Sequence, residues 1–167
     1  RKIGINTLKL MTPQVMIDIK AYPRGEELIN IVKTRTDDSE LQKSAMEILG
    51  GWKYEPAVDI LANYLIDGNL IEQAASSLEA IGNDKSRFYF YLYSGHSEEA
   101  AKISEAQEWV GLALKSKINS IVKNALIVTR TLKASRWAED TLTIAKTQTT
   151  EQDLRKIAIE ILGEWKY

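Results

Sequence analysis

Apolar residues recur every three to four positions along most of this chain, which is the period of an α-helix with one buried face. The pattern is clearest from Glu26 onward, where Leu, Ile and Ala alternate with Glu and Lys. The three prolines, Pro13, Pro23 and Pro56, stand where helices could begin, a position that proline tolerates. Helices are therefore predicted at residues 12–21, 25–34, 37–50, 56–66, 69–81, 86–95, 97–116, 119–133, 136–147 and 151–163.

Two of these helices have predicted caps. Asp37 followed by Glu40 has the spacing of a capping box, and after the Asp67-Gly68 turn Asn69 followed by Glu72 predicts a second helix start. The segment SRFYFYLYSG is ambiguous, because Phe and Leu alternate there with Tyr at the period of a strand. Its neighbours are helical, so a short helix is predicted.

The chain contains a long internal repeat. A shift of about 113 residues places residues 5–54 over 118–167 without a gap, and about 20 of about 50 aligned positions are identical. The segments ELQKSAMEILGGWKY and DLRKIAIEILGEWKY belong to this alignment, and so do polar loop residues such as Asn6 with Asn119. Convergent amphipathic helices would share apolar spacing but not loop residues. We interpret the repeat as the duplication of a large module.

A shorter period lies inside this module. LIEQAASSLEAIGNDK aligns with LQKSAMEILGGWKYEP at a shift of about 29 residues, as expected for a solenoid of two-helix units, each covering the apolar face of the last. We predict one solenoid domain over residues 1–167. The second copy stops at EWKY, where the first continues into Pro56, and the chain does not begin with Met. We therefore expect it to be a fragment that continues beyond Tyr167.

The segments LGGWKYEPAVDILANYL and DGNLIEQAASSLEAIGND resemble the HEAT repeat, particularly its short form in bilin-lyase-type proteins, over residues 24–84 and again over 138–167. The sequence departs from the family pattern at Trp52-Lys53-Tyr54, where Ile-Gly-Asp is usual, and at Gln42 and Ile71, where Arg is common. The resemblance implies an all-α, right-handed α–α superhelix of about five two-helix units, with the second helices lining a concave face. The residues that match the pattern are Leu49, Gly50, Ala57, Val58, Leu61, Ala74, Leu78, Ile81 and Gly82.

Composition narrows the chemistry further. Lys and Arg number 22 and Asp and Glu 23, so the chain lacks the basic excess that binding to a nucleic-acid backbone requires. It has no Cys and one His, which leaves no metal site to expect. The sequence shows no Gly-rich phosphate loop, no signal peptide and no apolar run long enough to span a membrane. We expect a cytoplasmic protein without cofactor.

No catalytic constellation is evident. His96 could act as a base for Ser94 or Ser97, but nothing specifies an orienting acid or an oxyanion site, so a surface histidine is predicted. The carboxylate pairs at residues 37–38 and 98–99 fall at predicted helix starts, where the helix dipole favours negative charge. A non-enzymatic protein is therefore expected.

Candidate partner-binding residues come from two features of the repeat. Lys-Tyr follows Trp in both copies, and while Trp52 and Trp165 suit packing between helices, the tail at Lys53 and Tyr54 could dock a partner. Lys and Glu recur at i,i+4 on the second helix of equivalent units, either as solvated ion pairs or as a charged ladder facing a partner. The residues of this ladder are Lys43, Glu47, Lys156 and Glu160.

The SRW turn adds Arg136 and Trp137, which the repeat does not demand because Trp137 aligns with Arg24. They are candidates for a specific contact, with packing as the alternative. For the aromatic residues Tyr89, Tyr91 and Tyr93 packing is predicted.

The leading hypothesis from sequence is a protein-interaction scaffold that presents a concave helical surface to a protein or peptide. Two alternatives stay open through the HEAT resemblance. A DNA glycosylase-like protein would use Trp137, Asp140 and Arg130, and a bilin-lyase-like tetrapyrrole chaperone would use Tyr89, Tyr93 and Trp109.

Overall fold

The protein is described by a computed structural model that covers residues 25–147 and 151–167. The helix predicted at residues 12–21 lies outside these residues. The chain forms two compact units: the described residues of unit 1 are 25–65 and 69–86, and those of unit 2 are 66–68, 87–147 and 151–167.

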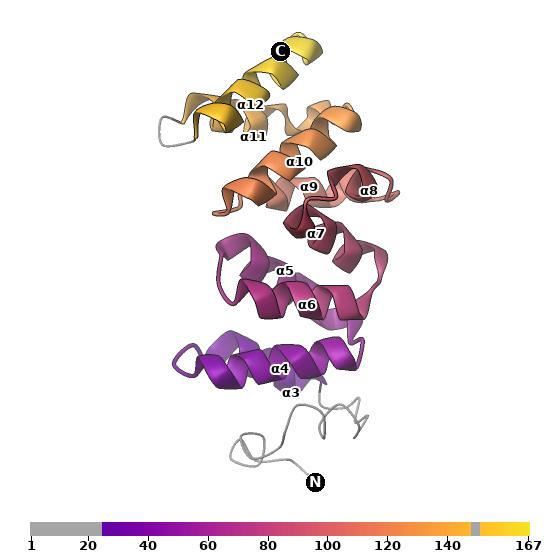
Figure 1. The fold of residues 1–167 in the computed structure, drawn as a ribbon, viewed down its shortest axis with the longest axis vertical. Coiled ribbons are helices and arrows are strands. Elements are labelled where there is room, and N and C mark those ends of the chain that lie inside the picture. Colours follow the sequence, from indigo (N-terminus) through magenta and orange to yellow (C-terminus); the bar gives the residue numbers. More distant parts are fainter. Residues whose placement is uncertain (1–24, 148–150) are drawn as a thin grey trace. The chain divides into compact units, whose positions relative to one another are not determined.

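Every regular element in the described part of the chain is a helix, so the all-α prediction is confirmed (Figure 1). Helix α7 runs from the end of unit 1 into unit 2. The short helix predicted from SRFYFYLYSG is confirmed as part of α7. In chain order the elements are α3 (Gly25–Thr34), α4 (Ser39–Gly51), the 3-10 turn η2 (Glu55–Ala57), α5 (Val58–Asp67), α6 (Ile71–Ile81), α7 (Asp84–Ser94), α8 (Ser97–Ala101), α9 (Ala106–Ala113), α10 (Asn119–Thr131), the 3-10 turn η3 (Ser135–Trp137), α11 (Ala138–Lys146) and α12 (Gln152–Trp165).

In unit 1, α4 packs against both α3 and α6, and α4 and α6 lie side by side in Figure 1 with α3 and α5 behind them. The helical period places apolar residues on the side of α4 and α6 that faces the other helices. Met46, Leu49 and Leu78 are fully buried there. This is the core of unit 1.

The backbones of α4 and α6 approach each other at Gly50. A Cβ atom on this residue would lie 2.8 Å from the Cα of Ser77, and the Ser77 hydroxyl donates a hydrogen bond to the carbonyl oxygen of Met46 over 2.9 Å. The glycine therefore serves helix packing, and α4 ends at the next residue, Gly51.

A second polar contact joins α3, α4 and α5. The buried amide of Gln42 and the hydroxyl of Tyr64 both donate to the carbonyl oxygen of Val32, at 2.7 and 2.6 Å. Val32 lies in the last turn of α3, whose carbonyls have no partner within the helix. The Gln42 side chain of α4 thus caps the last turn of α3.

In unit 2, α10 packs against α8, α9 and α12, and α11 packs against α12. The single helix predicted over residues 97–116 is wrong: it is broken between α8 and α9. Ala100 of α8 and Ala106 of α9 are both fully buried, and both helices pack against α10. Two backbone hydrogen bonds close the end of α8: the Lys102 N–H donates to the Glu99 carbonyl oxygen, and the Ile103 N–H donates to the Ala100 carbonyl oxygen.

The two predicted caps are also corrected. Asp38, one residue after the predicted Asp37, caps α4 by accepting a hydrogen bond from the Leu41 amide at 3.1 Å, while Asp37 pairs with Arg35. Asn69 does not open α6. Its backbone N–H donates to the backbone carbonyl oxygen of Tyr64 and so closes the end of α5.

The two aligned copies form the same elements over their described residues. Helices α3 and α4 correspond at a shift of about 113 residues to α11 and α12, whose ends agree within one or two positions. The carbonyl contact recurs as well: Arg155, aligned with Gln42, donates to the carbonyl oxygen of Ala145, aligned with Val32, at 3.3 Å. Arg155 was not singled out from the sequence, although it follows the first apolar residue of α12.

Helix ends repeat in the same way. At the end of α4 the Tyr54 amide donates to the Leu49 carbonyl and the Lys53 amide to the Gly50 carbonyl, which is a Schellman motif. Lys53 has a φ of 52° and so occupies the left-handed region that usually favours glycine. The same pairs of bonds, with Lys133 and Lys166 at positive φ, close α10 and α12.

Equivalent glycines are expected to respond to substitution with opposite signs. Gly50→Ala should destabilise the protein by about 1–2 kcal/mol, because its Cβ would clash with the backbone of α6. Gly163→Ala, at the aligned position of α12, should stabilise it by about 0.5–1 kcal/mol, because no described atom lies within 4 Å and alanine favours the helix. Denaturant unfolding of both variants checks this, and equal signs would contradict the packing described for Gly50.

Candidate partner-binding surfaces

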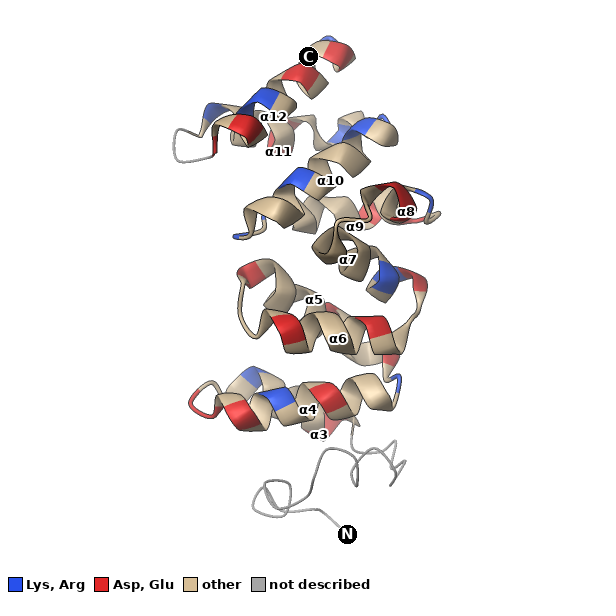
Figure 2. Ribbon diagram, in the orientation of Figure 1, with Lys and Arg blue, Asp and Glu red and all other residues tan. Residues whose placement is uncertain are grey.

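The charged residues of α4 and α6 lie together on the exposed face of unit 1. On α4 these are Glu40, Lys43 and Glu47, and on α6 they are Glu72 and Glu79. Figure 2 colours the acidic and basic positions along the ribbons of both helices. Glutamates seven residues apart share one face of a helix. The result is two parallel rows of carboxylates around a single cation.

Lys43 lies between these carboxylates. Its ammonium donates to Glu40 at 2.8 Å, and this hydrogen bond, with the nearby charges of Glu40, Glu72 and Glu47, raises its pKa. The ion pair of Lys43 with Glu47, one of the two interpretations of their spacing, does not form, because Lys43 pairs with Glu40 in the preceding turn. We call the surface formed by Glu40, Lys43, Glu47, Glu72 and Glu79 the acidic face.

The aligned residues of unit 2 have different partners. Glu160 lies 4.0 Å from Arg130, which also makes two hydrogen bonds to Glu164. Lys156 has no ion pair among the described residues, so the predicted pair with Glu160 does not form. The Lys–Glu ladder is thus shared by sequence but not by structure.

The Trp-Lys-Tyr tail of the first copy is used for packing. Trp52 is buried, as the packing interpretation expects, and the Tyr54 hydroxyl donates to the Glu26 carboxylate at 3.1 Å. The Tyr54 ring covers Gly25, where a Cβ atom would lie 2.3 Å from it. Lys53 is exposed and remains the part of this tail that a partner can reach.

The tail of the second copy keeps one of these contacts. The Tyr167 hydroxyl bonds to Glu139, which aligns with Glu26. Ala138 stands where the first copy has Gly25, and Tyr167 is 60% exposed. Trp165 is half-buried, in contrast to Trp52.

Arg136 and Trp137 both face other residues of unit 2. The Arg136 guanidinium pairs with Glu108 on α9 and lies 5.3 Å from the Trp137 ring. The indole N–H of Trp137 donates to the carbonyl oxygen of Gln107 at 2.8 Å, and its ring covers Gly111. Trp137 therefore anchors η3 to α9, which corresponds to the packing alternative.

Most residues of the two alternative functions are engaged within unit 2, but Tyr93, for which packing was predicted, is 36% exposed. Arg130 bonds to Glu164, and Asp140 lies 3.3 Å from Lys115. Tyr89 is 2% exposed and packs edge-on against Phe88, which makes a similar contact with Trp109. Tyr89 would have to leave this cluster to contact a pigment.

The Ser94 hydroxyl lies 2.8 Å from Nδ1 of His96 at the exposed end of α7. The same hydroxyl donates to the carbonyl oxygen of Phe90 at 2.9 Å, as serine in a helix end commonly does. This contact therefore has a structural explanation.

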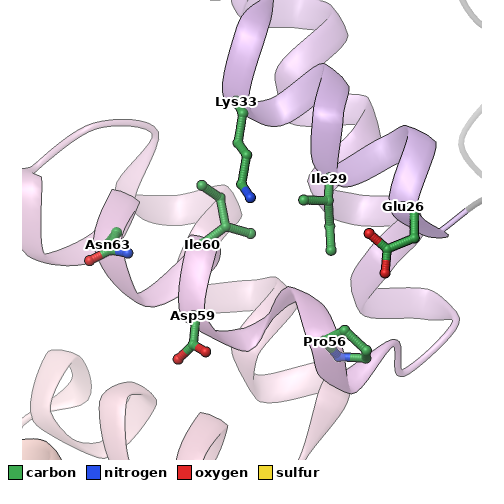
Figure 3. A pocket seen from close by; sticks show the side chains of 7 residues that line it. All are labelled: Glu26, Ile29, Lys33, Pro56, Asp59, Ile60 and Asn63. Carbon is green, nitrogen blue, oxygen red and sulfur yellow. The ribbon is translucent and has the colours of Figure 1, made fainter.

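The far side of unit 1 has a shallow pocket of about 290 Å³ between α3 and α5 (Figure 3). Ile29, Pro56 and Ile60 supply its apolar part. Two of its acidic groups already have partners, since Glu26 bonds to Tyr54 and Asp59 pairs with Lys85 at 2.6 Å. The carboxylates of the acidic face are more freely available.

No known protein family, curated protein or solved structure matches this chain in comparison. Among the described residues no cluster of three or more His, Asp or Glu side chains is placed to hold a metal ion. None of the described helices combines the length and apolar character that a membrane crossing needs.

The Trp137 anchor gives a test of its packing role. Gly111→Ala would place a Cβ atom 2.2 Å from the indole ring, so the ring should be displaced and the protein destabilised by about 1–2 kcal/mol. The indole N–H resonance of Trp137, assigned with Trp137→Phe, should shift to the position of a solvent-exposed indole. Gly163→Ala is the matched control, and an unchanged indole resonance in Gly111→Ala would contradict the anchor.

The Tyr54–Glu26 contact predicts a dependence on alkaline pH. Burial and the bond to the Glu26 carboxylate raise the pKa of Tyr54 above its ordinary value of 10.0. A pKa raised by folding gives stabilisation that is fully present below about pH 10 and is lost as the pH rises through the folded-state pKa.

Glu26→Gln removes the neighbouring charge, so it should lower the pKa of Tyr54 in an ultraviolet titration of the phenolate. Glu27→Gln, an exposed neighbour on α3, is the control. Identical titration curves for the two variants would show that the contact does not form.

Proposed function

We propose that this protein is a non-enzymatic protein-interaction scaffold of HEAT-like helical repeats, and that it binds a protein or peptide partner along the acidic face. The duplicated helical hairpins support the repeat architecture. We further propose that they continue as a right-handed α–α superhelix with the second helices on its concave side, as the family resemblance implies.

The observation that carries the proposed binding surface is the charge of α4 and α6. Four glutamates and one lysine make up all the charged residues of these two helices, although the whole chain is nearly neutral. Lys43 already offsets Glu40, which leaves Glu47, Glu72 and Glu79 without an ion-pair partner among the described residues. Such a face is complementary to a basic segment and repels a nucleic-acid backbone.

Charge reversal tests this surface. Glu47→Lys combined with Glu79→Lys should abolish capture of the partners that the wild-type chain retains from an extract, and those partners should cross-link through lysine-rich or arginine-rich segments. Capture should weaken as salt is raised, because exposed charges are screened. Mass spectrometry of the captured and cross-linked proteins provides the measurement.

A variant with the same change in net charge, Glu99→Lys with Glu105→Lys in unit 2, is the control and should retain the partners. Capture of the same proteins by both variants would contradict the acidic face as the binding surface. Retardation of DNA at low salt, or a change in bilin absorbance on mixing, would support one of the alternative functions instead.

A further inference from the structure

The pocket between α3 and α5 is a groove whose two walls both belong to the described part of unit 1. Its floor is apolar: Ile29 of α3 is 7% exposed, and Ile60 of α5 is half-buried and lies beside the exposed Pro56. Its volume of about 290 Å³ is near the lower limit for ligand pockets in proteins. A groove of this size takes a few side chains and not a folded domain.

The two ends of the groove carry opposite charges. Glu26 lies in the first turn of α3 and Lys33 in its last turn, so their positions are about 10 Å apart along the helix. Figure 3 shows both side chains, with Ile29 between them, projecting from α3 toward the segment that carries Pro56 and Ile60. The groove therefore has an acidic, an apolar and a basic position in a row.

The basic end of the groove is available to a ligand. Lys33 is exposed, and its ammonium has no ion pair or hydrogen bond with any described residue. On the facing wall Asn63 is exposed, and its side-chain amide, which offers two N–H donors, is unbonded within the same part of the chain. Both side chains can donate to a carboxylate that enters this end.

The opposite end keeps a negative charge. The Tyr54 hydroxyl donates to the Glu26 carboxylate at 3.1 Å, and it stays protonated at neutral pH because the pKa of this tyrosine is raised above 10.0. A neutral donor leaves the carboxylate charged and able to accept further hydrogen bonds. Asp59, by contrast, is already paired with Lys85 at 2.6 Å. Glu26 is therefore the group of this end that can pair with a cation.

The α3 wall of the groove recurs in the second copy. Lys146 of α11 aligns with Lys33, is also exposed and also has no ion pair among the described residues. The helix dipole favours a lysine in a last turn, but it does not set the spacing of that lysine from a glutamate and an apolar residue. Three residues of α11 keep the acidic, apolar and basic positions of α3: Glu139, Leu142 and Lys146.

We propose that this groove binds a short extended peptide segment of a partner protein, and that the segment carries an acidic, an apolar and a basic side chain in that order. The acidic side chain pairs with Lys33 and Asn63, the apolar one covers Ile60, and the basic one pairs with Glu26. An extended chain advances about 3.3 Å per residue, so the two charged residues of the segment are three positions apart. The site is independent of the acidic face, because it lies on the far side of unit 1 and requires both charges in one ligand.

A peptide library identifies the segment without a prior choice of its sequence. Random seven-residue peptides displayed on phage are selected on the full chain, and the same selection is run on Lys33→Glu. The expected result is a motif with an acidic and a basic residue three positions apart, which the wild type enriches and the variant does not. Basic peptides that bind the acidic face should be enriched equally by both chains. Enrichment of those peptides alone, or of none, overturns the proposal.

Charge exchange tests the position of the acidic residue. The enriched peptide should bind the wild type with a Kd below about 1 mM. Lys33→Glu should weaken this binding by about tenfold, because a repulsion replaces an attraction, and a peptide with lysine in place of the acidic residue should regain it. Lys123→Glu on α10 makes the same change in net charge at another exposed lysine and should bind as the wild type does. No restoration by the exchanged peptide overturns the assigned contact.

The acidic end of the groove has a matched pair of variants. Glu26→Gln should weaken peptide binding several-fold, whereas Glu27→Gln, at an exposed residue of α3 that does not line the groove, should leave it unchanged. Equal binding by these two variants contradicts the proposed pairing. Concentration-dependent dimers that vanish in Lys33→Glu, together with no enriched motif, would assign the groove to a second copy of the chain and overturn the peptide.

Discussion

The close approach of α4 and α6 at Gly50 is the contact on which the structure of unit 1 depends. A two-helix hairpin leaves one apolar face uncovered, and this face is buried only when the next hairpin comes near. The absence of a side chain at Gly50 permits that approach, and the bond from Ser77 to the Met46 carbonyl fixes its register. Met46 and Leu78 can then be fully buried between the helices.

Comparison of the two copies separates contacts within a hairpin from contacts between hairpins. Two contacts occur in both copies. Gln42 and its aligned residue Arg155 each donate to a carbonyl oxygen of the preceding helix, and a lysine at positive φ follows the second helix of each hairpin. Both are made within one hairpin, so they are fixed by local sequence. Met46 is fully buried, whereas the aligned Ile159 is 57% exposed, so this burial is not a property of the hairpin sequence alone.

The near-zero net charge of the chain conceals an uneven distribution. Two arginines of unit 2 are paired with glutamates, Arg130 with Glu164 and Arg136 with Glu108. In unit 1 the two second helices gather carboxylates around Lys43. Composition measures only the sum of charges, whereas a partner meets their local arrangement.

The sequence by itself determined the helical class, most helix positions and the correspondence of the two copies, because apolar periodicity and repetition are properties of the chain alone. It failed where the outcome depended on which neighbour a helix or a side chain contacts in the folded chain. The chain breaks between α8 and α9, which both pack against α10, although the apolar period continues through residues 97–116. Lys43 pairs with Glu40 and not with Glu47, although both glutamates lie within one turn of it on α4. Only the tertiary structure decided that Gly50 is a contact and Gly163 an open surface, since the same residue in the same helix takes its role from what packs against it.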